Sequence, residues 1–214
     1  MNDEAVDGTI QEAELRRLLL MGFGLILLAA VGGIVCGLLV GPPAAPSSPG
    51  TSGLISSGDT ARQALAPAAD LAVQWQEDAQ LAGVSSCLPV EEIKQGGEIE
   101  WTFQFFSAST QRLALFTVSG GEAHRVRESL SPYAVPTFSR RAWRVDSDQA
   151  RQTWLDQGGS RMIARRPDTD LAMKLGISED GEQHPVWTIT GFIAGAESAL
   201  TVKVDAADGA LLEP

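Results

Sequence analysis

The sequence has 214 residues, of which 44% are hydrophobic and 20% are charged, a composition typical of an ordered protein rather than a disordered one. The net charge is −11, which argues against a nucleic-acid partner, because binding to phosphates requires a positive surface. The two cysteines, Cys36 and Cys87, fall in an apolar stretch and in the region beyond it, so we expect no intrachain disulfide. The hydrophobic core must then hold the fold together unaided.

Residues 18–40 are uncharged and predominantly apolar, and about 20 such residues can cross a bilayer as one helix. Arg16 and Arg17 precede this stretch, whereas no Lys or Arg follows it before Arg62. The asymmetry predicts that the tail, residues 1–17, is cytoplasmic and that everything after the stretch is extracytoplasmic. A cleaved signal peptide would have a shorter apolar region, of roughly 7–15 residues. We therefore predict a single-pass protein of the cell (inner) membrane.

Small residues recur every four positions in the second half of this stretch. Such a groove lets another helix approach closely in lipid, although glycine is also common in membrane helices generally. The pattern fits a helix–helix contact either with a second copy of the chain or with another membrane protein. The candidate contact residues are Ala29, Gly33, Gly37 and Gly41.

Proline, glycine and serine dominate residues 41–58, which cannot bury enough apolar surface to order themselves. We predict a flexible linker with a reach of roughly 20–25 Å. The linker would keep the following domain near the membrane without fixing its orientation.

The region after the linker contains an internal repeat with a spacing of roughly 86–90 residues, which predicts two copies of one unit over residues 59–139 and 140–214. Three blocks occur in the same order in both copies. The matched blocks are Ala61-Arg62-Gln63 with Ala150-Arg151-Gln152, Asp78 and Leu81 with Asp168 and Leu171, and Trp101-Thr102 with Trp187-Thr188.

Each copy is predicted to contain a helix followed by three strands. The first helix should begin near Thr60, a good capping residue, and break at Pro67. The second should begin near Ser147 and break at Gly158 and Gly159. The predicted fold class is therefore α+β: a single N-terminal transmembrane helix followed by two repeated units, each a kinked helix on a three-stranded antiparallel sheet.

The strands are predicted from the alternation of apolar and polar residues. Within residues 98–106, the side chains of Ile99, Trp101, Phe103 and Phe105 share one face. The strand before it alternates less clearly, with Leu81, Gly83, Ser85 and Cys87 on one side. Cys87 is predicted to be a buried, inert thiol, and the alternative is an intermolecular disulfide through it.

Residues 199–212 resemble the closing hairpin of PepSY domains, in which a valine-rich strand ends in Asp-Ala and a turn ends in glycine. Residues 185–189 resemble the middle strand of that family. The resemblance extends over about residues 147–214 and reaches the first copy only through the internal repeat, because the Asp-Ala-x-x-Gly turn is missing there. It implies an extracytoplasmic domain without catalytic residues, either an accessory part of a membrane protein or an inhibitor of a peptidase.

The turn can also be derived from the residues themselves. Asp205 and Asp208 suit a tight turn, and Gly209 can take a positive φ. A calcium site at these two aspartates would lack the density of oxygen ligands that calcium requires.

No motif in the sequence marks an active site. His124 and His184 are about sixty residues apart, and there is no H-E-x-x-H, C-x-x-C, G-x-S-x-G or phosphate-binding glycine loop. We therefore expect no enzymatic activity, cofactor, metal or small-molecule substrate.

The arginines are the most informative charged residues. Nine of the thirteen fall between Arg125 and Arg166, a segment with a net charge of +5 in an otherwise acidic chain. They form either a solvated face or a docking surface for anionic lipid headgroups or an acidic partner. Trp143 fits a core position equally well. The candidate docking residues are Arg140, Arg141, Trp143 and Arg144.

These observations predict a non-enzymatic accessory or structural subunit that binds another protein at the membrane. The alternative is a membrane-tethered peptidase inhibitor or regulator.

Overall fold

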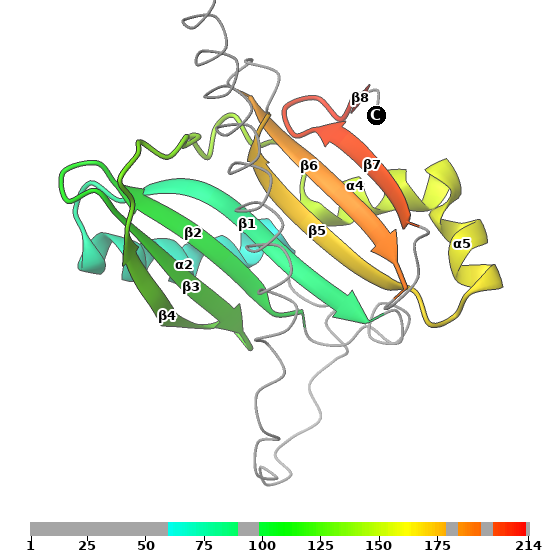
Figure 1. The fold of residues 1–214 in the computed structure, drawn as a ribbon, viewed down its shortest axis with the longest axis horizontal. Coiled ribbons are helices and arrows are strands. Elements are labelled where there is room, and N and C mark those ends of the chain that lie inside the picture. Colours follow the sequence, from blue (N-terminus) through cyan, green and yellow to red (C-terminus); the bar gives the residue numbers. More distant parts are fainter. Residues whose placement is uncertain (1–59, 90–98, 179–183, 194–198, 213–214) are drawn as a thin grey trace, which may run out of the picture. The chain divides into compact units, whose positions relative to one another are not determined.

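The computed structural model describes residues 60–89, 99–178, 184–193 and 199–212, all within one compact unit, Gly53–Pro214. Its strands form one eight-stranded sheet in the order β4-β3-β2-β1-β5-β6-β7-β8 (Figure 1). Every neighbouring pair in this sheet is antiparallel. The strands are β1 (Gln80–Pro89), β2 (Trp101–Ser107), β3 (Arg112–Ser119), β4 (Glu122–Leu130), β5 (Asp170–Ile177), β6 (Pro185–Phe192), β7 (Ala199–Asp205) and β8 (Leu211–Leu212).

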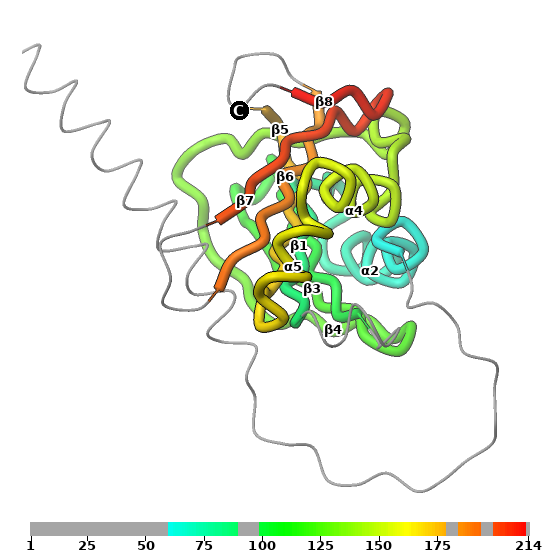
Figure 2. Tube along the Cα trace, turned by 90° about the vertical axis from the view of Figure 1, so that its right-hand side faces the viewer, coloured from blue at the N-terminus to red at the C-terminus, as the bar shows by residue number. Residues whose placement is uncertain are grey.

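In each half of the chain, the helical segment comes before the four strands. Helix α2 (Ala61–Trp75) comes before β1, and α4 (Ser147–Trp154), the π-helical turn η1 (Leu155–Gly159) and α5 (Ser160–Arg165) come before β5. Figure 2 shows α2 and α4 side by side on the same face of the sheet. The core lies between these helices and that face.

The predicted fold class is wrong, because the two halves do not form separate three-stranded, PepSY-like units. Each half contributes four strands, and β1 pairs with β5 from Val84 opposite Leu175 to Pro89 opposite Asp170. A three-stranded unit would leave the N–H and C=O groups of its first strand unpaired at a sheet edge. Pairing β1 with β5 gives these N–H and C=O groups hydrogen-bond partners in both halves and makes one continuous sheet.

The fourth strand of the first half follows a two-residue turn, Gly120-Gly121, in which both φ angles are positive. Strand β4 has no buried residue, so it carries no apolar alternation by which the sequence could reveal it. It forms one edge of the sheet, where charged side chains discourage pairing with other chains.

Among the described residues, no helix is long and apolar enough to cross a membrane. The predicted membrane segment, residues 18–40, lies outside the described residues. The same holds for the cytoplasmic tail (1–17), the linker (41–58) and the predicted helix–helix contact residues Ala29, Gly33, Gly37 and Gly41.

The predicted faces of β2 are confirmed, since Trp101, Phe103 and Phe105 are all buried in the core. In β1 the prediction fails beyond Gly83, because a β-bulge between Leu81 and Gly83 shifts the register by one residue. Gly83 itself is buried as predicted, but after it the buried residues are Val84, Ser86 and Leu88 rather than Ser85 and Cys87. Cys87 is half-buried, opposite Ala172 of β5.

The predicted helix starts are close to the observed ones, and both helices have a capping box. Thr60 caps α2 with Gln63, and Asp146 rather than Ser147 caps α4. Helix α2 is not interrupted at Pro67 but continues to Trp75, whereas the second helix is interrupted where predicted, at Gly158, with φ +124°. Gln63 is exposed, so water can hydrate the carbonyl that the proline leaves without a helical donor.

The predicted turn after β7 is confirmed. Asp205 accepts a hydrogen bond from the amide of Ala207 (2.6 Å), Asp208 accepts one from the amide of Ala210 (2.8 Å), and Gly209 has φ +84°. Both carboxylates therefore act as acceptors within the turn itself.

Candidate functional site

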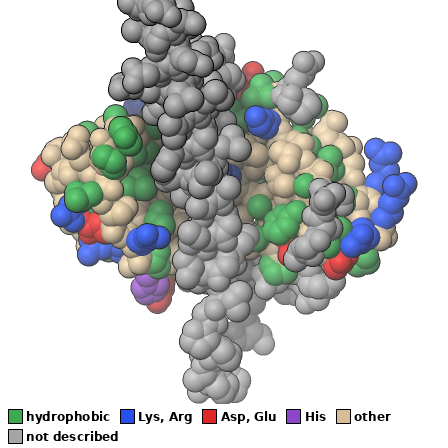
Figure 3. Space-filling model, in the orientation of Figure 1, with side chains coloured by type: hydrophobic (Ala, Val, Ile, Leu, Met, Phe, Trp, Pro, Cys, Tyr) green, Lys and Arg blue, Asp and Glu red, His purple; other side chains and the backbone are tan. Residues whose placement is uncertain are grey.

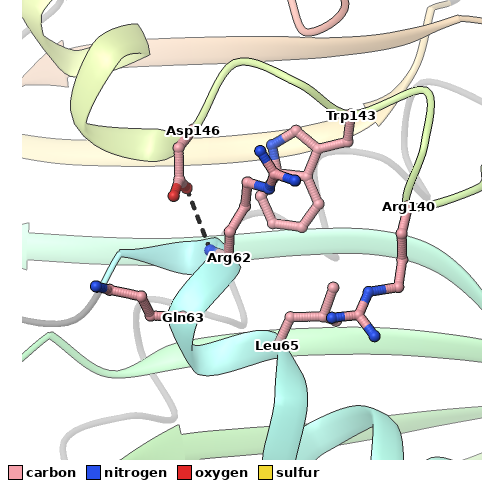
Figure 4. Close-up of a pocket in the computed structure, with 6 residues that line it drawn as sticks. All are labelled: Arg62, Gln63, Leu65, Arg140, Trp143 and Asp146. Atoms are coloured by element: carbon pink, nitrogen blue, oxygen red, sulfur yellow. Dashed lines mark hydrogen bonds between the residues drawn. The ribbon is translucent and has the colours of Figure 1, made fainter.

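A hollow of about 340 Å³ lies between the first turns of α2 and the segment that leads into α4. In Figure 4, one wall comes from α2 and the other from the loop before α4. The hollow thus brings together two segments that are far apart in the sequence. It is lined by Arg62, Gln63, Leu65, Arg140, Trp143 and Asp146.

Asp146 joins the N-termini of the two helices at this hollow. Its Oδ1 accepts hydrogen bonds from the amide of Ser147 in α4 (2.7 Å) and from the amide of Arg62 in α2 (3.2 Å). The hydroxyl of Ser147 also accepts a hydrogen bond from the amide of Ala61 (3.0 Å). Negative charge is favoured at a helix N-terminus, so this carboxylate is held in place by two helices at once.

The loop beside the hollow is fixed by a tryptophan pair. The carbonyl of Val145 accepts hydrogen bonds from the indole N–H of Trp143 (2.8 Å) and of Trp187 (2.9 Å). The two rings meet edge to face with centroids 5.9 Å apart, and the amides of Arg144 and Val145 both donate to the carbonyl of Ala206. Side chains that project from this loop therefore start from a rigid backbone.

The four predicted docking residues fall into two environments. Arg140, Arg141 and Arg144 are exposed, whereas Trp143 is only 1% exposed and belongs to the core. Trp143 thus supports the loop from within the core. The docking role of the three arginines stays a prediction.

Arg62 was missed by sequence reasoning, although it lines the same hollow as Arg140. Its guanidinium donates a hydrogen bond to the carbonyl of Arg144 (3.1 Å). The capping patterns at Thr60 and Asp146 mark the two helix starts in the sequence. Only the pairing of β1 with β5 brings those starts together, and no local pattern encodes that pairing.

The hollow has a positive character. Within the described part of the chain, no carboxylate forms an ion pair with Arg62 or Arg140, and the carboxylate of Asp146 is engaged as the shared helix cap. Guanidinium groups present a planar set of donors that matches carboxylate and phosphate oxygens. The arrangement suits the recognition of an anionic group.

A second arginine-lined groove, of about 440 Å³, lies beside α5. Figure 3 shows Lys and Arg side chains gathered at the side of the molecule where α5 lies. The groove is lined by Gln157, Gly158, Arg161, Met162, Arg165, Arg166, Ile193, Ala199 and Leu200.

The histidines are placed far apart, His124 on the edge strand β4 and His184 before β6. His124 Nε2 lies 3.8 Å from Glu122, and His184 Nε2 lies 3.4 Å from Asp205. Over the described ranges, no group of three or more His, Cys, Asp and Glu side chains is arranged to hold a metal ion.

Three carboxyls outside the two grooves have shifted pKa values. Hydrogen bonds from Ser107 and Ser109 lower the pKa of Asp78. Burial, together with the nearby charge of Asp168, raises the pKa of Asp170. The third is Glu128, whose pKa is lowered chiefly by the hydrogen bond from Arg112.

No protein-family model matches the chain, and no curated protein matches its sequence. A solved structure that does match is described as a "putative lipoprotein" from Clostridium difficile 630, with 12% sequence identity and a TM-score of 0.45 over 68% of this chain and 88% of that one. At this TM-score the similarity carries no argument about fold or function.

Proposed function

We propose that the protein is a non-enzymatic, membrane-associated accessory subunit that binds another protein through the hollow between α2 and the loop before α4. The apolar segment at residues 18–40 would tether it in the membrane, with its C-terminal domain on the extracytoplasmic side. The observation that carries the proposal is the convergence of Arg62 and Arg140 on one hollow, without an ion-paired carboxylate among the described residues.

Two further features favour a protein partner. Arg141 and Arg144 are exposed on the same loop, so the positive surface extends beyond the hollow. The rigid backbone of this loop, tied down by Trp143 and Trp187, lowers the entropy lost on binding. Arginines on such a preorganised surface are frequent binding hot spots, and an acidic side chain of the partner would complement them. Peptidase inhibition, in contrast, rests only on the resemblance of the C-terminal segment.

The test is co-purification of the full chain, tagged at its C-terminus, in a mild detergent. We expect a partner at constant stoichiometry, and its loss when Arg62 and Arg140 are both replaced by glutamate. The matched control is Arg161→Glu with Arg165→Glu, which changes the net charge by the same amount on α5.

The decisive step follows once the partner is identified. Replacing its contacting acidic residue by lysine should restore binding to the Arg62→Glu/Arg140→Glu variant. The proposal is wrong if that variant retains the partner at full stoichiometry, or if the α5 control loses the partner to the same extent.

A further inference from the structure

The groove beside α5 exists because the helix is interrupted where Trp154 enters the core. Trp154 is fully buried, and its indole N–H donates to the carbonyl of Leu200 (3.0 Å). A Cβ atom at Gly159 or at Gly191 would overlap the indole ring, so both positions require glycine. The π-helical turn η1, with Gly158 at φ +124°, accommodates this packing before the chain resumes as α5.

Helix α5 presents its cations next to an apolar floor. Arg161 and Arg165 are four residues apart and therefore lie on one face of the helix, and Arg166 follows at its end. All three are exposed, and across the described ranges only Arg166 forms an ion pair, with Asp168 at 3.4 Å. This floor consists of the apolar side chains that line the groove, among them Ile193 and Leu200.

We infer that this groove binds the phosphate headgroups of an anionic membrane. Arg161 and Arg165 would contact phosphate oxygens, and the floor would contact the apolar part of the lipid at its glycerol end. Among the described residues that line the groove there is no carboxylate, so their charge is complementary to an anionic surface although the chain as a whole carries −11. A free phosphate ion would need the cations but would gain nothing from Ile193 and Leu200.

Binding through this groove would orient the domain relative to the membrane. An acidic domain is repelled by an anionic membrane except where it presents positive charge, so α5 would face the bilayer. This inference rests on the membrane tether of the proposed function, but not on its protein partner. The hollow at Arg62 and Arg140 is lined by none of the residues that line this groove, and it would stay available to the partner.

The experiment uses the full chain in nanodiscs of phosphatidylcholine alone or with about one third phosphatidylglycerol. The measurement is hydrogen–deuterium exchange of the amides in residues 160–166. We expect exchange to be several-fold slower in the anionic discs at low salt, and the difference to shrink as ionic strength rises, because salt shortens the Debye length to about 3 Å at 1 M.

Each variant is compared between the two disc compositions, so a change in the intrinsic stability of α5 cancels. Arg161→Glu with Arg165→Glu should abolish the difference, and Arg140→Glu with Arg141→Glu should leave it intact. Equal exchange in both discs for the unmodified chain would overturn the inference. So would equal protection by inorganic phosphate in phosphatidylcholine discs, which would identify free phosphate as the ligand.

The two proposals fail in different ways. If the chain does not enter nanodiscs at all, the tether of the proposed function is wrong and the inference falls with it. If the chain enters the discs but α5 exchanges equally in both, only the lipid site is wrong. Retention of the protein partner by the Arg161→Glu/Arg165→Glu variant is the further sign that the two surfaces are independent.

Discussion

The helices of the two halves bury different side chains against the sheet. In the first half, the buried face of α2 is mostly alanine, with Ala64, Ala68 and Ala72 beside the larger Leu65, and large side chains come from the strands as Phe103 and Phe116. In the second half, the helix adds a fully buried tryptophan to the large side chains of the strands. Trp154 packs there against Gly191 of β6, where any side chain on the strand would collide with it.

In a close-packed layer, large side chains must face small ones. The difference between the halves shows that either the helix or the strand can supply the large side chain. It also explains the two helix shapes. A buried face made mostly of alanine leaves α2 continuous over 15 residues in spite of Pro67. A tryptophan that must reach the sheet leaves no room for a side chain at Gly159, and the helix opens into the π-helical turn η1.

The strongest test of this comparison is Trp154→Ala, which removes the large side chain that the helix contributes to the second half. We expect a loss of about 3–5 kcal/mol in the free energy of unfolding, typical of large aromatic side chains removed from a core. Urea unfolding of the full chain in mild detergent measures it. All five tryptophans lie in the described domain, so the four that remain report on its unfolding.

The control for this prediction is Val73→Ala on α2. Val73 is 58% exposed, so its truncation should change stability by less than about 0.5 kcal/mol. A loss below about 1 kcal/mol for Trp154→Ala would show that the second half does not depend on bulk from its helix.

Gly191→Ala tests the small side of the same contact. The added methyl group would overlap the Trp154 ring, and such overpacking typically costs about 1–3 kcal/mol. Gly176→Ala is the matched control, because within the described part of the chain a Cβ there would meet only Cε of Lys174, at 3.9 Å.

The pair also makes a double-mutant cycle. Once Trp154 is alanine, the cost of Gly191→Ala should largely disappear, because the methyl group then fills vacated space. Additive effects in the double variant would contradict the proposed complementarity between residues 154 and 191.

Asp146→Ala tests the junction between the halves rather than either half alone. One cap typically contributes about 1 kcal/mol, and Asp146 serves both α2 and α4, so we expect a loss of about 2 kcal/mol. Thr60→Ala removes a cap from α2 only and should cost about half as much. Equal losses in the two variants, measured by urea unfolding, would mean that the bond from Asp146 to Arg62 contributes nothing.

The sequence predicts well whatever is local. Alternation placed the β2 side chains on the correct face, and the turn at Asp205, Asp208 and Gly209 followed from the preferences of those residues. The features that the sequence could not reveal depend on contacts between residues that are far apart in the chain. The bulge after Leu81 has no residue signature, β4 lacks apolar alternation, and the union of β1 with β5 is a tertiary pairing.

The residues of the candidate site divide in the same way into those that a local pattern reveals and those that only the fold brings together. Arg140 could be selected from the sequence because the arginines cluster there, and Trp143 could not be assigned to the surface or to the core. The approach of Arg62 to Arg140 depends on the two helix N-termini meeting at Asp146. A charge pattern read along the chain therefore finds half of such a site, and the half contributed by the other segment becomes visible only in the fold.

The smallest expected effect concerns Asp78 and its repeat partner Asp168, which hold equivalent positions before β1 and β5. Asp78 accepts hydrogen bonds from the hydroxyl of Ser107 (2.7 Å) and the amide of Ser109 (2.8 Å), which ties it to the β2–β3 turn and lowers its pKa. Among the described residues, Asp168 has only the exposed ion pair with Arg166, and such pairs contribute little. At pH 7, Asp78→Asn should therefore lower the urea midpoint of unfolding more than Asp168→Asn.

The lowered pKa of Asp78 also determines how the difference in stability between the unmodified chain and Asp78→Asn should change with pH. The pKa of Asp78 in the folded chain lies below its unfolded value of about 3.9, so the unfolded state binds more protons between the two values and stability rises with pH there. The contribution is complete above the unfolded pKa and is lost as pH falls through the folded one. The midpoint difference between the unmodified chain and Asp78→Asn should accordingly shrink on acidification, and a difference that stays constant from pH 7 to pH 3 would show that the carboxylate charge has no part in holding the turn.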